Sequence, residues 1–165
     1  MRKWLEKPYH SLDYMLQDRF KEKVYKITLN GGMSCPNRDG TLGNRGCIFC
    51  SAGGSGDFAA DPSQSISAQI ESQMSLIQKK RPVQKFIAYF QAYTNTYGDP
   101  DRLLSCYEEA LSSPEVAGIS IATRPDCLSD IILEGLDRLQ LLYPDRFIWI
   151  ELGLQSIHDH TAARI

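Results

Sequence analysis

The chain has 165 residues, of which 42% are hydrophobic and 23% are charged, and its formal net charge is −2. This composition is typical of a globular protein with one hydrophobic core, and the near-neutral charge excludes a strongly basic nucleic-acid-binding chain. The N-terminus lacks the apolar stretch of a signal peptide. The chain also has no run of about 18 apolar residues. We therefore expect a cytoplasmic protein without membrane association.

Short strands and amphipathic helices alternate in the predicted secondary structure. Four segments are short and rich in β-branched or aromatic residues, which is typical of strands. These segments are 24–29, 86–90, 116–122 and 147–152. Between them, apolar residues recur at helical spacing, so we expect three helices with Asp61, Asp99 and Ser129 as their N-caps. The apolar positions of the third helix are Leu133, Leu136 and Leu139.

This alternation predicts an α/β fold with about four parallel strands covered by helices. Strands that are apolar throughout are typical of a parallel sheet buried on both faces, in either an open sheet or a barrel. Four strands are too few for a closed barrel of the TIM type, so we expect residues 1–165 to be the N-terminal portion of a longer protein. Within this portion, residues 1–23 are an N-terminal extension, and residues 30–61 are a loop long enough to suggest a function.

Three of the five cysteines, Cys35, Cys47 and Cys50, lie in the glycine-rich loop that follows the first strand. An odd number of cysteines grouped in this way suits metal or redox chemistry better than a disulfide framework. Thiolates are soft ligands that select zinc, copper(I) or iron-sulfur clusters, and loop amides can turn toward cluster sulfides. Three cysteines leave one iron of a [4Fe-4S] cluster without a protein ligand, and a substrate or cofactor can bind there.

A structural zinc site is the alternative interpretation of the same cysteines. A Cys-x-x-Cys pair with a third cysteine supplies three of the four zinc ligands, and His10, His158 or His160 could supply the fourth. The chain would then be a non-catalytic zinc-binding domain. We interpret Cys106, in the second helix, as a small buried hydrophobe, and Cys127 as a structural or incidental residue.

The cysteine loop and its flanks form two motifs, which are Asn30-Gly-Gly-Met-Ser-Cys35-Pro-Asn-Arg-Asp-Gly-Thr41 and Gly46-Cys47-Ile-Phe-Cys50-Ser-Ala-Gly-Gly-Ser-Gly-Asp-Phe58. They resemble the cluster loop of a bacterial radical S-adenosylmethionine (SAM) family related to the catalytic subunit of Elongator. The resemblance covers nearly the whole chain. It departs from the commonest radical SAM pattern because eleven residues, rather than three, separate Cys35 from Cys47. This wide gap resembles the Elongator-like branch.

The resemblance implies that Cys35, Cys47 and Cys50 hold a [4Fe-4S] cluster and that SAM contacts follow the strands of the sheet. The implied SAM contacts are Phe49, Gln91, Thr123, Arg124, Glu151 and Gln155. Their placement agrees with the location of active sites at the carboxyl ends of parallel strands. As alternatives, Gln91 could simply end its strand, and Glu151 could accept a hydrogen bond from a backbone amide. Arg124 could pair with Asp126 or with another carboxylate.

The resemblance also implies an activity. SAM would chelate the open iron, and one electron from a donor such as flavodoxin or ferredoxin would break a carbon-sulfur bond to give a 5′-deoxyadenosyl radical. This step requires no general acid or base among these residues. The relation to Elongator favours tRNA as the substrate, with modification of the wobble uridine, and the alternative is a small metabolite or a tetrapyrrole-like substrate. The missing C-terminal part would complete the substrate site, so this portion alone could be inactive.

Overall fold

A computed structural model describes Trp4 and residues 7–164. Within these residues, the centre of the molecule is a four-stranded sheet with the strand order β1-β2-β3-β4. The strands are β1 (Val24–Leu29), β2 (Lys85–Phe90), β3 (Val116–Thr123) and β4 (Phe147–Leu152). Each strand pairs in parallel with the strand before it. Each connection therefore runs from the carboxyl end of one strand back to the amino end of the next. The predicted α/β fold with four parallel strands is confirmed.

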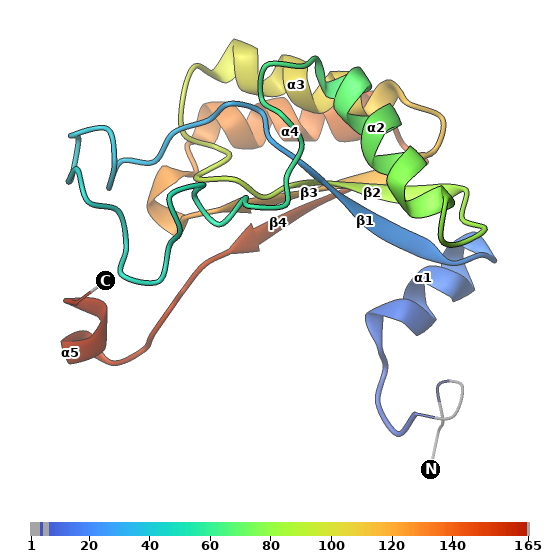
Figure 1. Cartoon of the computed structure of the whole chain (residues 1–165), viewed down its shortest axis with the longest axis horizontal. Coiled ribbons are helices and arrows are strands. Elements are labelled where there is room, and N and C mark those ends of the chain that lie inside the picture. The colour runs from blue at the N-terminus through green and yellow to red at the C-terminus, as the bar shows by residue number, and fades with distance from the viewer. Residues whose placement is uncertain (1–3, 5–6, 165) are drawn as a thin grey trace.

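In the described part of the chain, three helices cover one face of the sheet (Figure 1). They are α2 (Ile66–Gln78), α3 (Pro100–Ser112) and α4 (Asp130–Leu142). Each begins after a residue whose side-chain oxygen accepts a hydrogen bond from a backbone N–H of the first turn, and these residues are Ser65, Asp99 and Ser129. Two of the three predicted N-caps, Asp99 and Ser129, are confirmed.

The main hydrophobic core lies between the sheet and these helices. Alternate strand side chains point toward the helices, among them Leu29 and Phe90, which are fully buried. The ring of Tyr107 on α3 meets the ring of Phe90 edge to face, with centroids 5.0 Å apart. This packing fixes the position of the sheet relative to α3.

Two α-helices lie outside the predicted elements, α1 (Leu12–Phe20) beside the sheet and α5 (Asp159–Ala162) beyond the end of β4 (Figure 1). α1 lies in the segment predicted as an N-terminal extension, and Ser11 is its N-cap. Its Leu16 packs with Phe147 in a second apolar cluster, on the face of the sheet away from α2, α3 and α4 (Figure 1). Neither helix, nor any other helix in the described residues, combines the length and the apolar composition needed to cross a membrane.

The start of α2 differs from the prediction, which made Asp61 the N-cap. Ser65 caps this helix instead, because its Oγ accepts a hydrogen bond from the Ala68 N–H at 3.2 Å. Asp61 closes a preceding turn, since its carboxylate accepts from the Ser63 N–H at 2.9 Å. This hydrogen bond holds the pKa of Asp61 below its ordinary value. The prediction was wrong because an Asp-Pro pair favours a turn as well as a helix start.

The buried face of α4 also differs from the prediction at one position. Ile132, Leu136 and Leu139 are buried, whereas Leu133 is 41% exposed. Gly135 lies on the buried face, where an added Cβ would come within 2.4 Å of the Leu104 side chain on α3. The close approach of α3 at this glycine therefore fixes the face that α4 turns to the core.

Two equal substitutions on α4 test this assignment. We expect Leu136→Ala to lower the free energy of unfolding by about 2–5 kcal/mol, because it leaves a cavity in the core. The matched control Leu133→Ala removes a partly exposed side chain and should cost clearly less, about 1 kcal/mol. Urea unfolding of both variants measures the difference. Similar losses in the two variants would contradict the assigned face.

Candidate functional site

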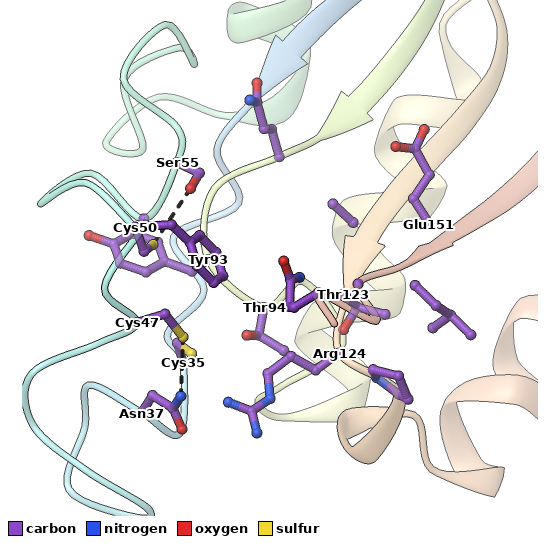
Figure 2. A pocket seen from close by; sticks show the side chains of 18 of the residues that line it. Cys35, Asn37, Cys47, Cys50, Ser55, Tyr93, Thr94, Thr123, Arg124 and Glu151 are labelled. Atoms are coloured by element: carbon purple, nitrogen blue, oxygen red, sulfur yellow. Dashed lines mark hydrogen bonds between the residues drawn. The ribbon is translucent and has the colours of Figure 1, made fainter. Parts of the chain in front are cut away.

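A pocket of about 610 Å³ opens at the carboxyl ends of the strands (Figure 2). Its walls come from the loop after β1 and from the segments that end or follow β2, β3 and β4. The volume lies within the range of small-molecule and cofactor sites, roughly 300–1,000 Å³. All the residues predicted as cluster ligands or SAM contacts line this pocket: Cys35, Cys47, Phe49, Cys50, Gln91, Thr123, Arg124, Glu151 and Gln155. These residues therefore share one pocket, and their roles stay predictions.

The loop between β1 and α2, residues 30–65, contains no helix or strand, and side chains of the helices hold its start. Gln69 of α2 is fully buried and pairs with both backbone groups of Asn30. It accepts from the Asn30 N–H at 2.9 Å and donates to the Asn30 carbonyl at 2.9 Å. Arg102 of α3 donates to the Gly31 carbonyl at 2.8 Å. The helices that build the core therefore also fix the direction in which the loop leaves the sheet.

The segment after β2 supports the middle of the same loop. Tyr93 donates its N–H to the Gly54 carbonyl at 2.9 Å and its hydroxyl to the Ala52 carbonyl at 3.1 Å. Gly54 has a φ of +63°, and a Cβ added there would lie 2.4 Å from the Tyr93 ring. A glycine is therefore required at this position for both its backbone conformation and its close approach.

Backbone hydrogen bonds close the eleven-residue gap between Cys35 and Cys47. The Gly46 N–H donates to the Asn37 carbonyl at 2.8 Å, which brings the two ends of the gap together. The Asn37 side-chain amide then donates to Cys47 Sγ at 3.2 Å. The Cys50 N–H donates to the Cys47 carbonyl at 3.0 Å, so these two cysteines share one turn. The wide spacing in the sequence thus returns Cys47 to the turn that begins at Cys35.

All five cysteines lie in the described part of the chain, and all are free thiols. Figure 2 shows the sulfurs of Cys35 and Cys47 beside Asn37, and that of Cys50 beside Ser55, whose hydroxyl donates to it at 3.6 Å. Among the described residues, no three Cys, His, Asp or Glu side chains are grouped as a metal-binding set. The structure therefore brings three thiols to one pocket without arranging them as a closed ligand set, and the metal centre stays a prediction.

The histidines considered for a zinc site pack against aromatic rings and are not part of the pocket lining. His158 and His160 stack on each other with ring centroids 5.7 Å apart, and His10 packs against aromatic rings near the N-terminus. All three are in the described residues, and none lines the pocket. Cys106 is also outside the pocket lining: the side chain is partly buried against the main core, and burial raises the pKa of its thiol.

Arg124 follows β3 and precedes the short helix η1 (Pro125–Cys127) on the pocket wall. Its guanidinium makes a bidentate pair with Asp126, with Nε to Oδ1 at 2.9 Å and Nη2 to Oδ2 at 2.7 Å. These hydrogen bonds raise the pKa of Arg124 and lower that of Asp126, and the Cys35 thiol contributes less to the rise. The Asp126 pair offered above as an alternative is therefore present, and it holds a cation near the thiols.

A polar cluster with one residue from each strand includes two residues that line the pocket, Tyr89 and Glu151. Glu151 of β4 accepts hydrogen bonds from Ser120 Oγ of β3 at 2.5 Å and from Lys26 Nζ of β1. The Lys26 ammonium also lies 4.0 Å from the ring centroid of Tyr89 on β2. Partial burial raises the pKa of Glu151, but the hydrogen bonds outweigh this effect and hold the pKa below its ordinary value. These partners are side chains, so the alternative of a backbone amide partner for Glu151 is wrong.

The other predicted contacts present different groups to the pocket. Thr123 is buried, and its hydroxyl shares a hydrogen bond with the hydroxyl of Thr96 at 2.6 Å. Phe49 is 53% exposed, and Gln155 is exposed on the loop after β4. Gln91 is half-buried at the end of β2. Thr123 therefore braces the wall, whereas the other three side chains are accessible to a ligand.

Sequence reasoning missed Lys26, Tyr89 and Ser120. Lys26 and Ser120 are polar interruptions in largely apolar strands, which is the signal that could have found them, whereas Tyr89 belongs to the apolar run 86–90 and gave no such signal. Tyr89 and Ser120 are register partners in the sheet, so they lie side by side. Asn95 was also missed, and its amide donates at 2.9 Å to the last carbonyl of β2 and at 2.9 Å to a carbonyl of β3. It ties two carboxyl ends together beneath the pocket.

The fold and the pocket define a class: a parallel α/β domain with a thiol-bearing pocket at the carboxyl ends of its strands.

No family model matches the chain. It is 46% identical over 160 residues to the uncharacterized protein YtqA of Bacillus subtilis, covering 97% of this chain and 49% of that protein. It is 42% identical over 152 residues to protein YhcC of Escherichia coli K12, with 91% and 47% covered. It is 40% identical over 149 residues to the uncharacterized protein MJ0486 of Methanocaldococcus jannaschii, with 88% and 44% covered. The chain spans about half the length of the curated relatives it matches.

The charge of Glu151 provides a test of the polar cluster. Glu151→Gln keeps the size of the side chain and removes the charge that Lys26 faces. We expect a loss of about 0.5–1 kcal/mol in the free energy of unfolding at neutral pH, a small value because the two side chains are 32% and 40% exposed. The folded pKa is depressed, so the wild type has this contribution above the ordinary value of 4.5 and loses it as pH falls through the folded pKa.

Urea unfolding at neutral pH and at about pH 3 measures the pH dependence. The difference between wild type and Glu151→Gln should shrink toward zero at the lower pH. Glu134→Gln, which alters an exposed carboxylate on α4, serves as the control and should differ little from wild type at neutral pH. A Glu151→Gln difference that is the same at both values would refute the stabilising charge pair.

Proposed function

We propose that the chain is the N-terminal portion of a radical SAM core, a partial TIM-type (β/α) barrel that holds a [4Fe-4S] cluster and reductively cleaves SAM. One observation carries this proposal: three free thiols share a pocket with polar residues from the ends of three other strands. A loop with a purely structural role would not need its thiols to face such a pocket. Because the relatives are about twice as long, the activity of the whole protein is part of the proposal.

The donor set fits the proposed cluster. Cys35, Cys47 and Cys50 supply the soft ligands that iron-sulfur clusters take from proteins. Hydrogen bonds to Cys47 Sγ at 3.2 Å and to Cys50 Sγ at 3.6 Å are of the kind that tune such ligands. Among the described residues, no three such side chains are grouped as a metal-binding set, so the ligand set is itself part of the proposal.

When bound, the cluster and SAM would supply one-electron cleavage of a carbon-sulfur bond and a 5′-deoxyadenosyl radical, with flavodoxin or ferredoxin as the electron donor. The residues of this chain would bind, orient and shield the cofactor. Phe49 would flank the adenine, and Gln91 would face the amino group of SAM. Glu151 or Gln155 would contact its methionyl or ribose groups. The Lys26 and Ser120 hydrogen bonds would keep the Glu151 carboxylate ionised and oriented.

Anaerobic reconstitution of the protein with iron and sulfide tests the cluster. We expect a brown protein with about four irons per chain. Cys35→Ala, Cys47→Ala and Cys50→Ala should each lose most of this iron, because each removes one ligand. The matched control Cys106→Ala alters a thiol of the core and should keep it. Iron and sulfide analysis and visible absorption measure the outcome.

Two results would contradict the proposal. Stoichiometric zinc without iron would favour a non-catalytic zinc-binding domain, and full iron content in all three alanine variants would exclude these cysteines as ligands. Cleavage is tested separately by adding SAM and a strong reductant to the reconstituted full-length protein and measuring 5′-deoxyadenosine. A cluster-loaded protein that releases none would refute the radical SAM activity.

For the substrate we propose tRNA, modified at its wobble uridine. The support is the resemblance of the cysteine loop to that of the catalytic subunit of Elongator, which is an argument from family and not from a site. The pocket itself is compatible with any substrate that reaches the carboxyl edge of the sheet.

Analysis of tRNA nucleosides by mass spectrometry tests the substrate. We expect tRNA from a strain that lacks the gene to have lost one modified wobble uridine. Expression of the wild-type gene should restore the nucleoside, and the Cys47→Ala variant should not. An unchanged nucleoside profile would overturn the tRNA proposal, and a changed metabolite profile in the same strain would favour a small-molecule or tetrapyrrole-like substrate.

A further inference from the structure

We propose that Arg38 is a positioning residue that holds the three thiol-bearing segments of the loop in one arrangement. Arg38 lies three residues after Cys35, and its side chain lines the pocket. Its backbone N–H donates to the Cys35 carbonyl at 2.8 Å, so Arg38 belongs to the turn that begins at the first cysteine. This inference deepens the proposed function and rests on it only for the identity of what the thiols hold.

The Arg38 guanidinium reaches the backbone at and after the third cysteine. Nη2 donates to the Cys50 carbonyl at 3.2 Å and to the Ser51 carbonyl, and Nη1 donates to the Ala52 carbonyl at 3.4 Å. Carbonyls in a segment without helix or strand need donors from elsewhere, and this side chain supplies three of them. One residue thereby binds the first segment through its backbone and the third through its side chain.

The residue before the second cysteine packs against the same side chain. Gly46, which precedes Cys47, has a φ of +72°, and a Cβ added there would lie 2.7 Å from Arg38 Nε. Any larger residue at position 46 would displace the guanidinium. The Gly46 N–H also donates to the carbonyl of Asn37, the neighbour of Arg38. All three cysteine segments therefore contact Arg38 or its own turn.

Tyr93 connects this arrangement to the sheet. Arg38 Cζ lies 5.7 Å from the centroid of the Tyr93 ring, within the range of a cation-π contact. The Tyr93 hydroxyl donates at 3.1 Å to the Ala52 carbonyl, which Arg38 also binds. The thiol segments are thus positioned relative to the end of β2, and through it relative to the strand-end residues across the pocket.

A lysine cannot replace the hydrogen bonds that Arg38 donates to the loop. A guanidinium is a planar fork with five donors, whereas an ammonium is a compact and strongly hydrated point charge. Arg38→Lys would keep the positive charge but could not reach three carbonyls of the loop at once. This variant therefore separates the geometric role of the residue from its charge.

The test compares Arg38→Lys and Tyr93→Phe with the matched control Arg45→Lys, which alters an exposed arginine of the same loop. Each protein is reconstituted anaerobically, and release of iron to a chelator is timed alongside the electron paramagnetic resonance spectrum. We expect Arg38→Lys to release iron at least about 10-fold faster than wild type, with a changed spectrum. Tyr93→Phe loses one hydrogen bond and should shift in the same direction by less. Arg45→Lys should match wild type.

A second readout requires no cluster. In the metal-free protein, alkylation by iodoacetamide is followed thiol by thiol with mass spectrometry, and urea unfolding checks that each variant folds. We expect Cys47 and Cys50 to react several-fold faster in Arg38→Lys, with Cys106 unchanged. Equal rates in wild type and a folded Arg38→Lys would overturn the positioning role, and if that variant fails to fold, equal rates in Tyr93→Phe would do so. A wild type that takes up no iron overturns the proposed function but not this test.

Discussion

The parallel register of the four strands is the constraint on which the pocket depends. Each strand pairs in parallel with the one before it, so the carboxyl ends of all four reach the same edge of the sheet. Asn95 reinforces this edge by bonding carbonyls of both β2 and β3. The Lys26 and Glu151 pair joins β1 to β4, with Ser120 as a second donor to the carboxylate. The topology therefore places the strand-end residues of the pocket together, and the loop after β1 supplies the rest of its lining.

The loop after β1 has no ladder of hydrogen bonds, so its backbone must be paired by other means. Gln69 pairs with both backbone groups of Asn30 at the start of the loop. Toward its end, the Ala60 N–H donates to the Thr28 carbonyl at 3.1 Å, which returns the chain to the side of β1. Between these points, Arg38 supplies donors to the segment that carries the last thiol. The thiols thus lie on a long loop whose two ends are attached to the elements that build the core.

The strands and most helix starts could be predicted because apolar runs and capping residues are local signals. The start of α2 could not, because Asp61 and Ser65 are both good caps and only the turn at Asp61 decides between them. The shared location of the candidate residues could also be predicted, because each lies at or just after the end of a strand, or in the cysteine loop. The pairing of Lys26 with Glu151 was not, since 125 positions separate them and only the strand order brings them together. α1 was not predicted, because its burial depends on contacts with the face of the sheet opposite α2, α3 and α4.

The two walls of the pocket are supported in different ways, and this difference determines how far a change at either wall can spread. Glu151 and its partners lie on strands whose neighbours are buried, so a change there is transmitted to the sheet. The thiol wall depends on hydrogen bonds from Arg38 and Tyr93 to loop carbonyls, and hydrogen bonds of an irregular loop have a lower local stability than those of a buried sheet. Under the proposed function, the loop can then adjust to its ligand as the thiols engage it, while the sheet keeps the opposite contacts in place. Precision at the strand ends and adaptability at the cysteines therefore come from separate parts of one fold.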